Sequence, residues 1–463
     1  MRFEIVVGLL LVAVVAAQRS CANSEDCFPL VCSATQRCVA CNSSDQCAGH
    51  DICGANGCRE RTLLESVGPA MITGMLVAIA TCAVAGVAGV GGGGILVPLY
   101  SATLGISLPK AVALSQATIS GQSFLTVCAK LRQGHPDDAK RALINWTIMT
   151  FWLPCSLAGT SIGNLVGKTV PDWFRIVLLL LLFSYTLFRV VKKVRLQRAS
   201  DRDRQRMLHD DVPANSVNAS IEPPAAAEPL RWRAMFPPFS AVVIACTFLP
   251  LGVVNYLQSS RAGLVACGSD TFWAMFSGAS VYNIAVTVLV RVHLRRVYFS
   301  LPEDGEEEIH FPFKWNRNTS VLFPIIAISA GGAASLLGIG GGLILSALFL
   351  EAGLTPEEVS ATSGITTFLV AAESFGQYAL QGMVDLDFGI AVCIAGLLGS
   401  VGGMLAQREI KRRGASFLIV GCLALIMGGS MVALTADGAY STWEAWKNHE
   451  SLGFKSLCSS HHA

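Results

Sequence analysis

The sequence carries the run Gly89-Val90-Gly91-Gly92-Gly93-Gly94 and, in its second half, the related run Gly338-Ile339-Gly340-Gly341-Gly342-Leu343. The residues that follow the two runs also correspond: Pro109 and Ala113-Leu114-Ser115 after the first, Pro356 and Ala361-Thr362-Ser363 after the second. Two diverged copies of a glycine-interrupted apolar segment are typical of secondary transporters. The substrate site is then expected where the two interrupted helices meet.

The composition predicts a chain embedded in lipid. Of its 463 residues 52% are hydrophobic and only 14% are charged, with a mean hydropathy of +0.53. A soluble domain has roughly 25% charged residues. The net charge of +2 gives no broad positive field, so we expect the lipid bilayer as a partner and no nucleic acid.

The first 17 residues have the pattern of a signal peptide. Arg2 precedes the apolar stretch Ile5–Val15, and Val15-Ala16-Ala17 is a small-residue cleavage site. A first membrane helix is the alternative, but the apolar stretch is too short to span a bilayer. We therefore expect an integral membrane protein of the secretory route, in the plasma membrane or an endomembrane, with its N-terminus extracellular or lumenal.

Residues 18–65 predict a small extracellular segment held by disulfide bonds. Eight cysteines lie in it: Cys21, Cys27, Cys32, Cys38, Cys41, Cys47, Cys53 and Cys58. Behind a signal peptide this density favours four disulfides, whose pairing the sequence leaves open. A zinc site is the competing interpretation, because Cys38 and Cys41 have metal-ligand spacing. Asn42 begins a glycosylation sequon.

Beyond residue 65, apolar stretches of membrane-spanning length alternate with polar connections, which predicts an all-α multi-pass membrane protein with two inverted-topology repeats. The predicted parts are a first membrane repeat (66–195), a disordered cytoplasmic linker (196–232), a middle helix pair (233–296), a cytoplasmic acidic loop (297–319), a second membrane repeat (320–436) and a tail (437–463).

Basic connections set the predicted orientation. Loops rich in Lys and Arg favour the cytoplasm, whereas the cysteine-rich segment belongs outside. Both demands are met if each glycine-interrupted segment passes out and back. The two repeats then begin on opposite sides of the membrane, an arrangement that supports alternating access.

The glycine runs have two competing interpretations. Gly89–Gly94 formally fits a dinucleotide fingerprint, but no acidic residue follows where the ribose contact would lie. Close helix packing by small residues is the other interpretation of the runs. We favour it for the scattered glycines Gly159, Gly163, Gly167, Gly399 and Gly403.

For the runs themselves we favour a functional role, because consecutive glycines break a helix. Inside lipid the freed N–H groups must face protein, water or a ligand, and N–H groups at a helix start bind anions. The predicted anion-binding residues are therefore Gly91, Gly92, Gly93, Gly94, Gly340, Gly341 and Gly342. No Lys or Arg lies inside the apolar stretches apart from Lys110, so we expect recognition by the backbone and not by a buried arginine.

Polar side chains close to the runs are further candidates. Ser115 and Gln122 in the first half, with Thr362 and Ser363 in the second, can donate hydrogen bonds to anionic oxygens. Helix–helix hydrogen bonding is their alternative role. Glu373 is the one acid inside a predicted span, which makes it a candidate for coupling to a proton or cation; a hydrogen-bonded glutamate near a membrane face is the alternative.

The two glycine runs with their proline and Ala-x-Ser segments resemble the sulfite exporter TauE/SafE family, over about residues 66–436. The resemblance implies a helical two-repeat membrane fold that moves sulfite, sulfonates or related small organic anions. The second copy departs from the family pattern at two positions. Leu343 stands where the first copy has Gly94, and Ala347 stands where the first copy has Pro98.

The sequence thus predicts a secondary transporter of small anions that works by alternating access, without catalytic residues, metal or cofactor. A cell-surface receptor or sensor built on a transporter-like body is the alternative. An intramembrane enzyme is disfavoured, because all eight histidines lie outside the apolar stretches.

Overall fold

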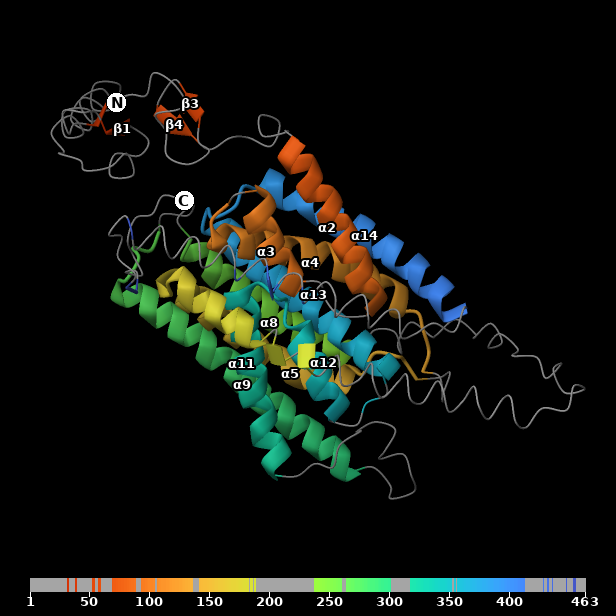
Figure 1. Ribbon diagram of the computed structural model, residues 1–463. Helices are drawn as coiled ribbons and strands as arrows, with labels where there is room; N and C mark the ends of the chain where they lie inside the picture. The colour runs from red at the N-terminus through yellow and green to blue at the C-terminus, as the bar shows by residue number, and fades with distance from the viewer. Residues whose placement is uncertain are drawn as a thin grey trace, which may run out of the picture. The chain divides into compact units, whose positions relative to one another are not determined.

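The computed structural model describes residues 69–88, 93–104, 106–135, 141–182, 237–259, 264–300, 317–351 and 356–412, together with two short hairpins and a few single residues (Figure 1). Several predicted features lie outside the described residues: the signal peptide 1–17, Cys21, Cys27, Cys41, Cys47, Asn42, Gly91, Gly92, the linker 196–232, and most of the acidic loop and of the tail.

The N-terminal unit, Met1–Met71 with the last four residues, contains two antiparallel hairpins. β1 (Val31–Cys32) pairs with β2 (Cys38–Val39), and β3 (Ile52–Gly54) pairs with β4 (Gly57–Arg59). The register sets Cys32 opposite Cys38 and Cys53 opposite Cys58. The disulfide framework of this segment stays a prediction.

The second unit, Ile72–Ser459, is helical. The first half comprises α2 (Pro69–Ala88), α3 (Gly93–Leu104), α4 (Leu108–Lys130) and α5 (Trp146–Thr169), followed by a helical segment at residues 172–182. The middle pair is α8 (Pro238–Leu257) and α9 (Asp270–Ser300). The second half comprises α11 (Arg317–Leu337), α12 (Gly342–Glu351), α13 (Pro356–Leu380) and α14 (Leu386–Arg412). Each half therefore has a helix, a glycine interruption, a short helix and two longer helices.

Three described helices, α8, α9 and α14, are long and apolar enough to cross a membrane. They lie at the periphery, where Leu249 of α8 and Leu289 of α9 are each 69% exposed. α9 has 31 residues and extends through Ser300, beyond the predicted end of the middle helix pair at residue 296. At 1.5 Å per residue it is about 46 Å long, which exceeds the hydrocarbon core of a bilayer.

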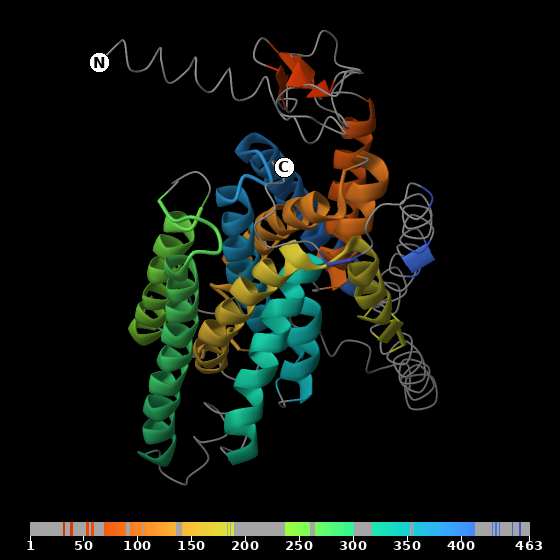
Figure 2. The ribbon, with the colours of Figure 1, turned by 90° about the vertical axis from the view of Figure 1, so that its left-hand side faces the viewer.

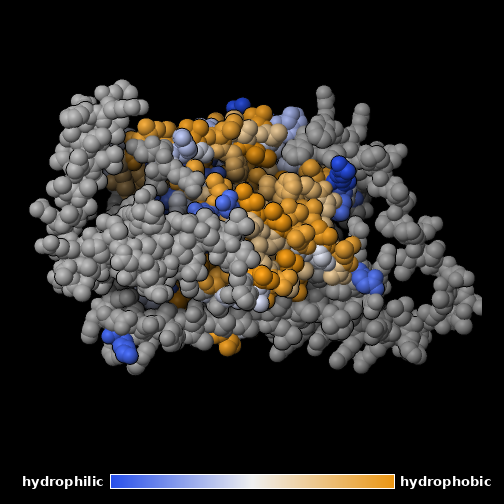
Figure 3. Space-filling view, turned by 90° about the horizontal axis from the view of Figure 1, so that it is seen from above, coloured by the Kyte–Doolittle hydropathy of each residue, from blue (hydrophilic) through white to orange (hydrophobic). Residues whose placement is uncertain are grey.

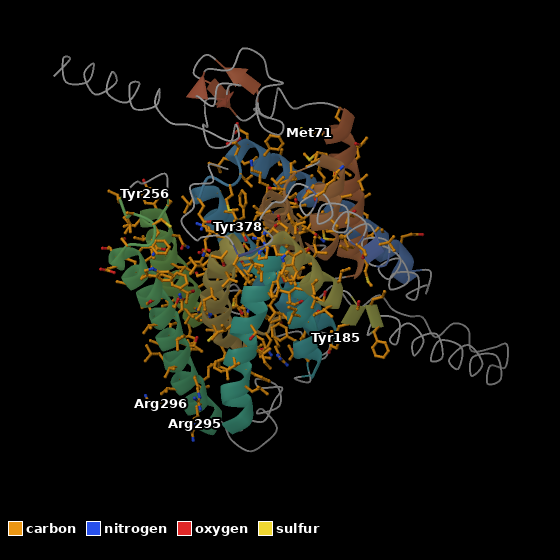
Figure 4. All side chains as sticks on the ribbon, turned by 60° about the vertical axis from the view of Figure 1, so that its left-hand side comes forward. Met71, Tyr185, Tyr256, Arg295, Arg296 and Tyr378 are labelled. Atoms are coloured by element: carbon orange, nitrogen blue, oxygen red, sulfur yellow. The ribbon has the colours of Figure 1, made fainter. Side chains whose placement is uncertain are left out.

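The middle pair defines two ends of the bundle. α8 and α9 run side by side (Figure 2), and Phe239 at the start of α8 stacks on His293 near the end of α9. Arg295 and Arg296 mark this end, which we call the arginine end (Figure 4). Tyr256 lies at the opposite end, which we call the Tyr256 end, close to the turn that contains the disulfide-bonded Cys267.

α14 shows how a helix divides its faces between lipid-like exposure and packing. Its exposed apolar side chains recur every three or four residues: Ile390, Ile394, Leu398, Val401 and Leu405. The opposite face carries Gly396, Gly399 and Gly403, which approach α4 and α2. Hydrophobic side chains cover much of the described surface (Figure 3), as expected for a protein surrounded by lipid.

α4 and α13 pack against each other in the interior. Their buried positions include many hydroxyl and amide side chains, such as Ser115, Gln116, Thr366 and Gln377. Neighbouring helices shield these groups from lipid, so the polar residues find partners in protein. The prediction of an all-α body with membrane-spanning helices is confirmed.

Two glycine pairs join the halves at close-packed seams. A Cβ on Gly159 or Gly163 of α5 would collide with the backbone of Ile328 or Gly332 in α11. A Cβ on Gly399 or Gly403 of α14 would likewise collide with α2, at Cys82 and Ile79 or at Ala83 (α2 and α14 are adjacent in Figure 1). The last of the four main helices in each half therefore packs on the first helix of the other half, and close packing accounts for these four glycines.

Candidate functional site

The second glycine run ends one helix and starts another. α11 stops at Leu337, and Gly338 follows with φ +71°, a left-handed conformation that favours glycine. The N–H of Ile339 donates to the carbonyl of Ala334 at 3.1 Å, which closes the helix end as in a Schellman motif. Gly340 and Gly341 also have positive φ angles, and α12 then begins at Gly342.

The start of α3 lies against the second glycine run inside the bundle. A Cβ on Gly93, the first residue of α3, would lie 2.6 Å from the carbonyl carbon of Ile339. Ile119 of α4 fills the space beside both runs, since it would contact a Cβ on either Gly93 or Gly340. Gly93 and Gly94 are buried, and so are Gly340, Gly341 and Gly342.

Side chains from α4 satisfy carbonyls at the end of α11. The Ser115 hydroxyl donates to the carbonyl of Gly338 at 2.7 Å, and the Gln116 amide donates to the carbonyl of Ala334 at 2.7 Å. Each contact links the first half to the second. Ser115 thus supports the broken helix directly in this conformation, which is the helix–helix role weighed against ligand binding.

The other predicted side chains have different surroundings. Gln122 donates to the carbonyl of Cys82 in α2 at 3.3 Å. The Thr362 hydroxyl accepts from the N–H of Asn145 at 2.9 Å. Ser363 is 2% exposed and makes no hydrogen bond with the described part of the chain. Gln122 therefore lies along the contact with α2.

The start of α12 presents peptide N–H groups. The N–H groups of Gly340, Gly341 and Gly342 have no acceptor among the described residues. The helix dipole places partial positive charge at such a start. The surrounding side chains include Ile119 and Thr367, so the groups lie in a weakly polar environment that strengthens electrostatic attraction.

Glu373 belongs to a network of amide side chains. Its Oε1 accepts from Asn255 Nδ2 of α8 at 2.7 Å and from Gln377 Nε2 at 3.1 Å. Gln377 also donates to Ser161 of α5 at 3.2 Å. Glu373 is 8% exposed, so it is a hydrogen-bonded and nearly buried carboxyl that connects the middle pair with both halves.

Asn164 extends this network and was missed by the sequence analysis. Its amide donates to Gln377, and its carbonyl oxygen accepts from Ser335 of α11 and from Ser374 of α13. We name Ser161, Asn164, Asn255, Ser335, Glu373, Ser374 and Gln377 the amide network. Isolated Asn and Gln residues within the apolar stretches were a usable signal, because polar groups inside membrane helices need partners.

Arg175 is a buried arginine that the sequence analysis did not single out. It precedes the apolar stretch 176–188 and therefore looked like a boundary residue. In the structure it is 4% exposed, and the end of α5 and Tyr378 of α13 cover it. A position next to an apolar run does not reveal which way a side chain points.

Charged groups tie the halves together near the arginine end. Arg141 Nη2 lies 2.6 Å from Glu358 Oε1, and His135 Nε2 lies 3.7 Å from Glu358 Oε2. Lys130 donates to Ser360, two residues further along α13. α5 begins close by, since Thr150 donates to Ser240 at the start of α8. These contacts close this end of the seam between α4 and α13.

No cluster of three His, Cys, Asp or Glu residues with the geometry of a metal site occurs within the described ranges. The site therefore consists of two helix interruptions, hydroxyl and amide side chains, one buried carboxyl and one buried guanidinium.

Comparison with known proteins gives a consistent result. The profile described as "Sulfite exporter TauE/SafE" matches residues 74–255 and 231–431. The chain is similar to "Sulfite exporter TauE/SafE family protein 5" of Arabidopsis thaliana, with 24% identity over 80% of this chain and 83% of the relative. It is also similar to family protein 1 (25% identity, 80% and 84% covered) and family protein 3 (27% identity, 84% and 83% covered) from the same plant.

No solved structure matches the chain. The family profile nevertheless spans both glycine runs and the helices around them. The chain belongs to the sulfite exporter TauE/SafE family of membrane proteins.

Proposed function

We propose that the protein is a secondary transporter of small anions, sulfite or sulfonates among them, and that it works by alternating access of two inverted repeats. Family membership supports membrane transport of such anions. The single observation that carries the mechanism is the contact between the two interruptions, where Gly93 lies against Ile339. Two helix starts that meet inside an apolar bundle offer N–H groups to one negative solute.

The reciprocal seams support the inverted-repeat part of the proposal. α5 packs on α11 through Gly159 and Gly163, and α14 packs on α2 through Gly399 and Gly403. In both contacts the last main helix of one half packs on the first helix of the other half. Such an arrangement is what a two-fold axis between the halves would produce, with α4 and α13 next to the axis.

The disulfide at Cys267 supports the orientation. Disulfides persist in oxidising compartments, so the turn between α8 and α9 belongs on the extracellular or lumenal side. Arg295 and Arg296, at the other end of α9, then face the cytoplasm, in agreement with the positive-inside rule.

Flux through reconstituted vesicles tests the mechanism. The Ser115→Ala, Ser363→Ala double variant removes two nearly buried hydroxyls, one of which supports the Gly338 carbonyl. We expect sulfite flux to fall about tenfold, since one or two charge-assisted hydrogen bonds are worth that much. Protein yield and membrane insertion should be unchanged.

Ser329→Ala is the matched control, because the exposed Ser329 hydroxyl donates only to Ile325 of its own helix. Its flux should equal that of the wild type. Unchanged flux in the double variant would remove both hydroxyls from the mechanism. A wild-type protein that moves neither sulfite nor any sulfonate would contradict the transport function itself.

A further inference from the structure

The Arg175 side chain is buried without a counter-charge. It is 4% exposed, and its Nε atom has no hydrogen-bond partner. Its side chain makes no ion pair or hydrogen bond with any described residue. An uncompensated buried charge costs several kcal/mol, so a guanidinium held in this way needs an anion from elsewhere.

Among the described residues, no acidic side chain supplies that anion. Asp172 lies one turn earlier on the same helical segment but forms no ion pair with it. Glu373 is engaged by the amides of Asn255 and Gln377. The guanidinium therefore keeps its donor groups available.

A phenol and a glycine complete the surroundings. A Cβ on Gly167, near the end of α5, would lie 3.7 Å from Arg175 Nη2 and 3.8 Å from Tyr378 Oη. These are ordinary van der Waals distances, so Arg175 Nη2 and Tyr378 Oη both lie close to the same side of Gly167. Tyr378 is 4% exposed and is labelled in Figure 4.

The phenol can exchange partners. Its hydroxyl donates to the carbonyl of Ser335 at 3.1 Å, and rotation about the C–O bond would direct the same proton toward an anion beside Arg175. Ser335 also donates to Asn164, so this position adjoins the amide network. An anion at Arg175 would therefore lie next to a polar path that leads inward along α13.

We propose that Arg175 and Tyr378 form an oxyanion-binding site toward the Tyr256 end of the bundle, specific for small anions that carry two or more oxygens on one centre. A guanidinium offers parallel N–H groups that match two oxygens of a sulfonate, sulfite or carboxylate, and it matches a spherical halide less well. The inference rests on the proposed anion transport, for which it names a binding residue outside the glycine runs.

The site and the helix interruptions are two places along one route. α13 runs from Glu358 near the arginine end to Tyr378, and its Thr367 would contact a Cβ on Gly340. An oxyanion bound at Arg175 would next meet the amide network and then the start of α12. The guanidinium collects the anion at one end, and the backbone N–H groups hold it between the halves.

Binding and flux are measured separately on the full-length protein. Thermal stabilisation of the purified protein by sulfite, by methanesulfonate and by chloride reports binding, and sulfite flux in proteoliposomes reports transport. We expect Arg175→Gln to weaken stabilisation by both oxyanions and to raise the KM for sulfite at least about tenfold. Arg175→Lys keeps the charge without the fork and should lie between Arg175→Gln and the wild type.

Tyr378→Phe keeps the ring and should raise the KM for sulfite about threefold, the effect of one hydrogen bond. Arg296→Gln is the charge-matched control, because Arg296 is exposed at the arginine end. It should leave stabilisation and KM unchanged.

Three results separate the hypotheses. Unchanged stabilisation by sulfite and unchanged KM in Arg175→Gln would overturn the proposed site while leaving transport intact. Stabilisation by sulfite that requires Arg175, in a protein without flux, would keep the site and contradict the transport function. If Arg175→Gln does not fold, Arg175→Lys decides, and a wild-type KM in that variant would count against the site.

Discussion

At the scale of single residues, the most consequential group is a carboxyl placed among amides. Glu373 accepts hydrogen bonds from Asn255 and Gln377, which come from two different helices. Both donors can be served by a carboxylate or by the carbonyl oxygen of a neutral carboxyl. The surroundings therefore tolerate a change of charge at Glu373, which a proton-coupling residue requires.

Replacing Glu373 by Gln tests this role. The variant keeps an acceptor oxygen for Asn255 but cannot exchange a proton, so we expect sulfite exchange at equal pH to persist within about twofold. Accumulation driven by a pH gradient should disappear. Uptake by proteoliposomes with and without the gradient measures both, and gradient-driven accumulation that survives in this variant would assign coupling to another group.

Glu373→Ala provides the contrast. It leaves two amide donors unpaired in a nearly buried position, which costs about 1–3 kcal/mol per group. This variant should be less stable than Glu373→Gln in detergent, and the difference separates structural support from coupling.

The sequence was informative where a residue changes the backbone and less so where only orientation matters. Consecutive glycines break a helix whatever surrounds them, so the second interruption at Gly338–Gly341 was predictable. Arg175, Asn164 and Tyr378 are functional candidates only because the fold turns them inward. That direction depends on which helices cover the segment, information that no single stretch contains.

At the scale of helices, the glycine seams decide how closely the halves approach. Gly163 of α5 faces the carbonyl of Gly332, and its position leaves no room for a methyl group. Gly163→Ala should therefore force α5 and α11 apart and destabilise the protein by about 1–3 kcal/mol. The midpoint of thermal unfolding in detergent measures the effect.

Gly278→Ala in α9 is the matched control for that substitution. A Cβ there would meet no heavy atom within 4 Å, so the exchange should be neutral or should stabilise the helix by up to about 1 kcal/mol. Equal midpoints for the two variants would mean that the α5–α11 seam can open without cost.

Helix positions agreed with the apolar stretches, but their ends did not. α9 continues through Ser300 because its last turns, with Arg291, Arg295 and Arg296, need no lipid contact to stay helical. Hydropathy detects the part of a helix that suits lipid and not the part that projects into water. α4 and α13 can contain many polar side chains because other helices, and not lipid, surround them.

At the scale of the whole molecule, the inverted arrangement makes a prediction about sidedness. Gln133, after α4, and Asp387, at the start of α14, are both exposed and follow corresponding helices of the two halves. In inverted repeats they lie on opposite sides of the membrane. Single variants Gln133→Cys and Asp387→Cys, labelled with an impermeant maleimide and located by mass spectrometry, should react from opposite sides.

Labelling of both positions from one side would contradict the inverted arrangement, although it would leave the helix packing unchanged. Lys447 is an exposed residue beyond α14. Labelling of a Lys447→Cys variant from outside would agree with a glycine-interrupted segment that passes out and back, followed by an odd number of passes.

The exchanged seams have a consequence for how the chain is made. α5 is synthesised well before α11, the helix whose backbone its Gly159 and Gly163 must touch, and α2 waits longer still for α14. We therefore expect lipid to cover the glycine faces of the early helices during translation. Maturation is completed only when the late helices arrive and displace that lipid.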